Sequence, residues 1–295
     1  MRNFLVAAAL VPATLASALC PAPAIADAPD AIVFEPTEPW ALDYADDSCK
    51  LTRMFAAGPD KLVLHLRQYA PGEAVEIAVA KTDGLGKSGI DYRFGTAGDF
   101  KPVESHGVRW GDLDGWMFGA SLTDISGERR DQSLPPWTSD ERKAALSDAA
   151  AISFRLSSGE ILDIQTGSLV PAFDAMSACL EELTTHWDID HEAHIALSRK
   201  ANPRSPTRYA MRVQEHYPLS ALRAGQSAWV AARIDVDAQG NGTACHIQNG
   251  SAETVFAKSI CTAASGDGLF EPALDEAGKP VSSYYTLQVS FMIPE

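Results

Sequence analysis

Apolar and polar residues alternate along much of the chain between Ile32 and Thr123. A period of two is typical of β-strands, and Gly58-Pro59-Asp60 and Pro71-Gly72 favour turns between the alternating stretches. We therefore expect a series of antiparallel strands. They are predicted at residues 49–57, 61–69, 74–82, 90–95 and 115–123.

The pattern then changes to a period typical of helices. A polar stretch at 139–150 predicts a helix that Ser139 caps, and residues 151–166 predict a hairpin around Gly159. A second helix opens at Ser168, and its apolar residues recur every three or four positions. These residues are Leu169, Phe173, Met176, Leu180, Leu183 and Trp187. One continuous apolar face of this kind must lie against a sheet.

The last eighty residues predict a small layer of helix on sheet. Strands are expected at 228–236, 242–248 and 284–292, and a helix at 252–264 should cover them. In the first of these strands the core-facing residues are predicted to be Val230, Ala232, Ile234 and Val236. The opposite face would carry Trp229, Ala231, Arg233 and Asp235.

Together these patterns predict an α+β protein of two domains. Residues 27–197 would form a β-rich antiparallel domain closed by a helix, and residues 217–295 the small helix-on-sheet domain. Residues 198–216 contain two prolines, five basic residues and no clear apolar period, which is typical of a linker.

The N-terminus has the pattern of a secretory signal. Arg2 precedes an apolar run from Phe4 to Leu19, and small residues lead to an expected cleavage after Ala26. The run is shorter than the roughly 20 residues that a membrane helix needs. We therefore expect a periplasmic protein without a transmembrane helix in its mature form; a lipoprotein anchored at Cys20 is the alternative.

The net charge disfavours some classes of partner, and the number of cysteines indicates disulfides. The formal net charge of −15 disfavours nucleic acid and anionic lipid as partners. An even number of cysteines beyond the leader favours disulfides in an exported chain. Cys49 lies on an early strand and Cys179 borders the apolar face of the long helix, while Cys245 lies on a strand and Cys261 on the last helix. We expect these two pairs, although pairings between the domains remain open.

The C-terminal segment also resembles a known family. Its motifs are Tyr217-Pro218, Gly225, a strand that ends at the Gly240 turn, and a Phe270-x-Pro272 sequence. In order and spacing they are similar to the C-terminal domain of the TonB family of periplasmic energy transducers. The resemblance implies an adaptor that carries no chemistry and whose free sheet edge pairs with a segment of an outer-membrane receptor. The edge it implies is the final strand, with Tyr285, Leu287, Gln288, Val289 and Phe291.

The chain also departs from that family, because a membrane-retained N-terminal helix and a long proline-rich spacer are both missing. Full energy transduction is therefore not expected. The prediction is a non-enzymatic periplasmic adaptor that binds envelope proteins in receptor-linked transport, without a cofactor. The alternative is an envelope hydrolase or ligand-binding protein with its site in the first domain.

Two stretches offer candidate metal sites. Asp235, Asp237, Gln239 and Gly240 fit the first positions of a calcium loop. The twelfth position is His246 instead of Glu, and strands flank the loop, so a hairpin turn is favoured. His186, His191 and His194 also resemble a zinc site, but the HEAH spacing is one residue short of HExxH. We expect no metal at either stretch.

Overall fold

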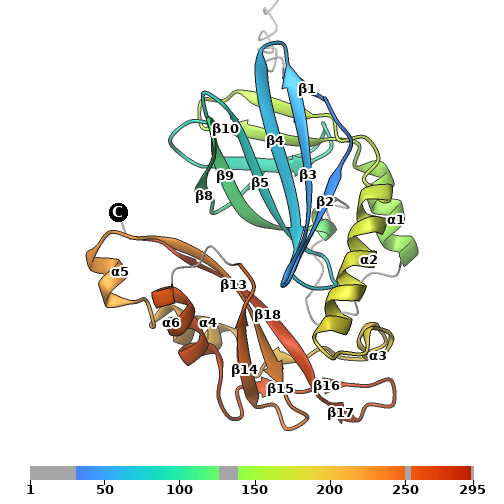
Figure 1. The fold of residues 1–295 in the computed structure, drawn as a ribbon, viewed down its shortest axis with the longest axis vertical. Coiled ribbons are helices and arrows are strands. Elements are labelled where there is room, and N and C mark those ends of the chain that lie inside the picture. Colours follow the sequence, from blue (N-terminus) through green and yellow to red (C-terminus); the bar gives the residue numbers. More distant parts are fainter. Residues whose placement is uncertain (1–30, 126–138, 250–253, 294–295) are drawn as a thin grey trace, which may run out of the picture.

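The computed structural model describes residues 31–125, 139–249 and 254–293. The predicted signal, its cleavage site and Cys20 lie outside the described residues. The described chain forms two units, each with its own buried core (Figure 1). The first core runs from Phe34 to Leu183 and the second from Leu197 to Phe291.

The N-terminal unit is built mainly from strands. Its strands are β1 (Ile32–Pro36), β2 (Ala41–Ala45), β3 (Ser48–Ala57), β4 (Asp60–Gln68), β5 (Ala74–Thr82), β6 (Ile90–Phe94), β7 (Lys101–Pro102), β8 (His106–Trp110), β9 (Leu113–Ser121), β10 (Ile152–Leu156) and β11 (Ile161–Ile164). A 3-10 turn (Leu122–Ile125) and the helices α1 (Ser139–Asp148), α2 (Val170–His186) and α3 (His191–Ile195) complete this part of the chain.

These strands form one curled sheet in the order β7-β6-β10-β11-β1-β3-β4-β5-β9-β8, and β2 pairs with β3 beside this path. The strands at the two ends, β7 and β8, follow each other in the sequence, so the sheet curls back towards itself (Figure 1). The fully buried rings of Phe34, Phe55, Phe118 and Phe154 help to fill its interior. The sheet differs from the antiparallel prediction at one place, because β1 and β11 pair in parallel.

Helix α2 packs its apolar face against the sheet as the sequence predicts. Leu169, Phe173, Met176, Leu180 and Leu183 are all buried. The helix begins at Val170 with Leu169 as its N-cap, rather than at the predicted Ser168. Pro171 in the first turn suits this start because a proline there loses no helical hydrogen bond. Ser168 instead accepts a weak hydrogen bond from the Val170 amide, at 3.4 Å.

The C-terminal unit is a three-stranded sheet covered by helices on one face. Its long strands are β13 (Ala228–Val236), β14 (Gly242–Ile247) and β18 (Ser283–Phe291), in the order β14-β13-β18. Its helices are α4 (Pro206–Gln214), α5 (Leu219–Arg223) and α6 (Thr254–Ala264). Short strand pairs complete it, formed by β12 (Asn202–Pro203) with β15 (Phe270–Glu271) and by β16 (Ala273–Leu274) with β17 (Pro280–Val281).

The stretch predicted as a linker, 198–216, is instead part of the C-terminal unit. It contains β12 and α4, and Tyr209 and Val213 of α4 are buried in the second core. The Tyr209 hydroxyl donates to the Ala264 carbonyl at the end of α6, at 3.0 Å. Only Tyr209 and Val213 of this short helix are buried, whereas Met211 is exposed, so the apolar residues of α4 do not all mark its core-facing side.

Candidate functional site

Strand β18 lies at an edge of the C-terminal sheet. It pairs with β13 along its whole length, from Ser283 opposite Val236 to Phe291 opposite Ala228. Among the described residues no strand pairs with its other side. An edge strand presents unpaired backbone N–H and C=O groups, which is the geometry that strand addition uses.

The side chains of β18 alternate between two surroundings. Leu287, Val289 and Phe291 are buried in the core beneath the helices, and Tyr285 packs against that core. Gln288, on the opposite face, is exposed, and its side-chain oxygen lies beside Gly119 of β9. Four of the five predicted edge residues therefore have a packing role. Recognition along this edge would fall to the backbone and to side chains such as that of Gln288.

The turn between β13 and β14 is stabilised by Asp237. Its carboxylate accepts hydrogen bonds from the backbone amides of Gln239 and Asn241, each at 2.9 Å, and from the Asn241 side chain. The hydrogen bonds from Asn241 are the largest cause that lowers the pKa of Asp237. His246, at the last position of the candidate calcium loop, instead contacts Asp235 at 2.8 Å. The arrangement is a hairpin turn, as the sequence predicts.

Gly240 in this turn has φ +85° and lies against Phe270. A Cβ atom at Gly240 would lie 2.2 Å from the Phe270 carbonyl oxygen, so no larger residue fits without a backbone shift. The Phe270 amide donates to the Gly240 carbonyl at 3.0 Å, and the Phe270 ring is fully buried. Two of the motif residues, far apart in sequence, thus form one structural unit.

The other motif residues also have local structural roles. The Tyr217 ring packs edge-on against Phe256 and Phe291, and its hydroxyl donates to the Gln226 carbonyl. Pro218 is the N-cap of α5. Gly225 follows α5 with φ +68°. Pro272 accepts a hydrogen bond at its carbonyl from Arg199 at 3.1 Å.

Both predicted cysteine pairs lie at disulfide distance. Cys49 on β3 bonds to Cys179 on α2, with an S–S distance of 2.00 Å. Cys245 on β14 bonds to Cys261 on α6, with an S–S distance of 1.96 Å. Each disulfide ties a helix to a strand of its own unit, so neither joins the two units.

The comparison with known proteins finds one family, and its match falls on this sheet and its motif residues. Residues 213–293 match the family model of the Gram-negative bacterial TonB protein C-terminal. The match covers the three long strands, α5 and α6, here called the TonB-like domain. No curated protein and no solved structure gives a significant match to the chain.

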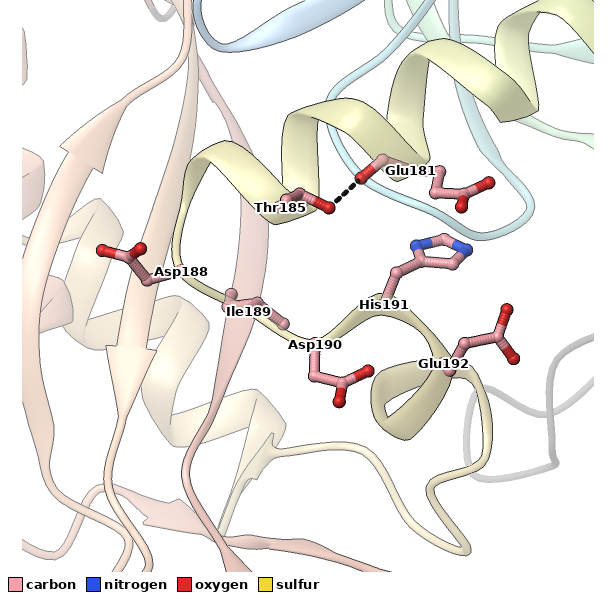
Figure 2. Close-up of a pocket in the computed structure, with 7 residues that line it drawn as sticks. All are labelled: Glu181, Thr185, Asp188, Ile189, Asp190, His191 and Glu192. Atoms are coloured by element: carbon pink, nitrogen blue, oxygen red, sulfur yellow. Dashed lines mark hydrogen bonds between the residues drawn. The ribbon is translucent and has the colours of Figure 1, made fainter.

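The three candidate zinc histidines do not converge. His191 lines an open hollow of about 460 Å³ with Glu181, Asp190 and Glu192 (Figure 2). The carboxylates in Figure 2 point in different directions, and the dashed line there is the Thr185 hydroxyl bonding to the Glu181 carbonyl. His194 is buried away from it against Tyr284, with ring centroids 4.5 Å apart. Within the described ranges no group of three or more His, Cys, Asp or Glu could hold a metal.

The outer face of the TonB-like sheet, opposite the helices, is covered by the preceding part of the chain, an interface that was not predicted from the sequence. On β13, Ala231 and Arg233 are buried there. We call this contact the interdomain seam; on the C-terminal side it consists of Trp229, Arg233, Gln248, Tyr284 and Ser290. The signal was present in the sequence, because a tryptophan and an arginine on a nominally exposed face are typical of an interface.

A buried carboxylate, Glu76 on β5, lies on the N-terminal side of the seam. Glu76 accepts hydrogen bonds from the Tyr69 hydroxyl at 2.6 Å and from the Trp229 indole at 3.0 Å. Arg67 forms an ion pair with it at 3.3 Å. Burial raises the pKa of Tyr69, and the nearby carboxylate raises it further. These donors compensate the buried charge and align β5 with β13.

Proposed function

We propose that this protein is a non-enzymatic adaptor of the cell envelope that binds an extended segment of another envelope protein along β18. The family match supports a TonB-like protein linked to envelope transport. Among the described residues no helix is long and apolar enough to cross a membrane. The adaptor role, the partner and an exported, periplasmic location are parts of the proposal.

The observation that carries the proposal is the unpaired edge of β18. Its core-facing side chains are already packed, so the strand needs no partner to be folded. Within the described ranges no strand occupies its outer side, so its outer backbone groups could form a further ladder with an incoming strand. Main-chain hydrogen bonds would supply affinity, and contacts with alternate side chains such as Gln288 would supply specificity.

The N-terminal unit has a packed interior. Buried aromatic and aliphatic side chains fill the interior of its sheet, where a barrel would hold a small molecule. A second open hollow, of about 340 Å³, includes Arg109, Asp114 and Trp116 in its lining. We propose that this unit positions the TonB-like domain.

Photo-crosslinking in intact cells tests the proposal. A photoreactive residue at Gln288 should give adducts with one or a few envelope proteins, each linked through an extended segment. The matched control is the same residue at Glu160, which is exposed in the β10–β11 turn of the N-terminal unit. Adducts at Gln288 that are absent, or identical to those at Glu160, would contradict binding along β18.

A further inference from the structure

The seam between the two units differs in chemistry from the cores on either side. The buried apolar clusters of the two units are separate, and polar and aromatic groups make the contacts between them. Trp187, Arg233 and Tyr284 each bury a polar atom there that has no hydrogen-bond partner among the described residues, although Arg233 also lies 3.3 Å from the Asp235 carboxylate. An interface of this kind resembles the polar contacts between domains that can separate, rather than a continuous core.

One histidine contacts β18 near its C-terminal end. His106, the first residue of β8, is 9% exposed, and its Nε2 lies 2.8 Å from the Ser290 hydroxyl. Its ring also packs edge-on against Trp229, with centroids 5.3 Å apart. The contact therefore joins an edge strand of the large sheet to both β13 and β18.

A second histidine contacts β18 at its other end. His194 of α3 is 5% exposed, and its ring stacks on Tyr284 with centroids 4.5 Å apart. Its Nδ1 lies 3.2 Å from the Ser283 hydroxyl. Trp187 packs edge-on against the same tyrosine and carries the Arg233 guanidinium over its ring. His106 and His194 thus come from separate elements and contact opposite ends of one strand.

The charged groups around the two histidines differ. Around His194, burial lowers the pKa of the ring, and the nearby Lys200 and His191 lower it further. Arg233 lies on the far side of Tyr284, where Asp47 and Asp235 partly balance it. Around His106, Glu104 favours the protonated ring, and Glu76 lies beyond Trp229. Both sites favour a neutral imidazole over an imidazolium. The preference is stronger at His194, where Lys200 and His191 are the charged neighbours.

We propose that His106 and His194 form a pH-sensitive latch that holds the TonB-like sheet against the N-terminal unit and releases it when the two rings become protonated. A buried imidazolium has lost its hydration, and separation of the units restores water to it. Burial lowers the pKa of His194 to about 4 and also lowers that of His106. Acidification therefore favours the state in which these rings are exposed, although Glu104 partly offsets the effect of burial at His106.

The latch goes beyond the proposed function, because it concerns the contact between two parts of one chain and needs no partner. Its consequence for strand addition rests on that function: release would free both ends of β18 from the N-terminal unit. The test below contains no partner, so its failure would leave the proposal of strand addition standing.

A distance measurement between the units tests the latch. A fluorescent dye pair on exposed Ser158, in the N-terminal unit, and exposed Glu276, in the C-terminal unit, reports whether the units stay docked. The variants are His106→Gln and His194→Asn, whose amides mimic the contacting ring nitrogens but do not protonate near neutral pH. The control is His65→Asn. His65 has a pKa lowered to about 4 by burial, but it contacts Thr52 and Trp110 within the N-terminal unit.

The latch predicts that energy transfer in the unmodified chain changes between about pH 6.5, the ordinary histidine pKa, and about pH 4.5. The double variant should keep its neutral-pH transfer over that range, and His65→Asn should behave like the unmodified chain. Circular dichroism at each pH confirms that both units remain folded. Transfer that is constant down to about pH 4.5, or a double variant with an unchanged midpoint, would overturn the latch.

Discussion

Replacing Gly240 by alanine should destabilise the TonB-like domain far more than the same change at another left-handed glycine. Gly240 has φ +85°, where a Cβ costs about 1–2 kcal/mol. The new methyl would also lie 2.2 Å from the Phe270 carbonyl oxygen and 3.1 Å from its carbon, and backbone cannot move aside as a flexible side chain can.

The shift that relieves this overlap has its own cost. It would weaken the hydrogen bond from the Phe270 amide to the Gly240 carbonyl, worth about 1 kcal/mol. It would also displace the fully buried Phe270 ring from Tyr209 and Tyr285, at about 1–3 kcal/mol for core repacking. The three contributions give a loss of about 3–6 kcal/mol.

Gly278 supplies the matched control. It lies in the turn between β16 and β17 with φ +78°, and a Cβ there would meet nothing within 4 Å. Gly278→Ala should therefore cost only the backbone strain, about 1–2 kcal/mol. Urea unfolding of both oxidised variants, followed by tryptophan fluorescence and circular dichroism, measures the difference. Equal losses of unfolding free energy in the two variants would refute the reasoning that the contact between Gly240 and Phe270 stabilises this domain.

Two further outcomes follow from the structure. Serine at both cysteines of a disulfide should cost about 5 kcal/mol in the N-terminal unit and about 3 kcal/mol in the TonB-like domain, because the sequence separations are 130 and 16; calorimetry that reversed this order would contradict the loop-entropy argument. The free energy of unfolding should also decrease as the pH falls. Burial lowers the pKa of His65 and of His194 to about 4, whereas the unfolded chain binds these protons near pH 6.5. Their contribution is complete above about pH 6.5 and is lost as pH falls towards 4, by about 3 kcal/mol for each histidine. Urea unfolding at a series of pH values measures the loss, which should be smaller in His65→Asn; an unchanged pH dependence in that variant would contradict this assignment.

The sequence predicted those parts of the fold that depend on local periodicity. The alternating strands β3, β4 and β5 pair as expected, α2 buries the predicted face, and the two disulfides follow from the positions of their cysteines on that strand and helix pattern. The TonB resemblance was likewise recognisable from spaced motif residues, and the family match confirms it.

The differences arise where long-range contacts decide the structure. No local pattern indicates that β1 pairs in parallel with β11, more than a hundred residues away. The role of α4 depends on Tyr209 and Val213 meeting a core that the later sequence supplies. The burial of Arg233 depends on a second unit covering a sheet face that appears solvent-facing in the pattern alone. Alternation identifies the two faces of a strand but not what covers each of them.

The central claim, strand addition along β18, is tested most directly by amide hydrogen exchange of residues 283–291 with and without the crosslinked partner segment. In an antiparallel or parallel ladder only the amides that point away from β13 gain new acceptors. Alternate amides of β18 should become protected when the segment binds, while the opposite edge of the sheet, β14, should keep its exchange rates. Binding that leaves every β18 amide unchanged, or that protects β14 instead, would contradict the claim.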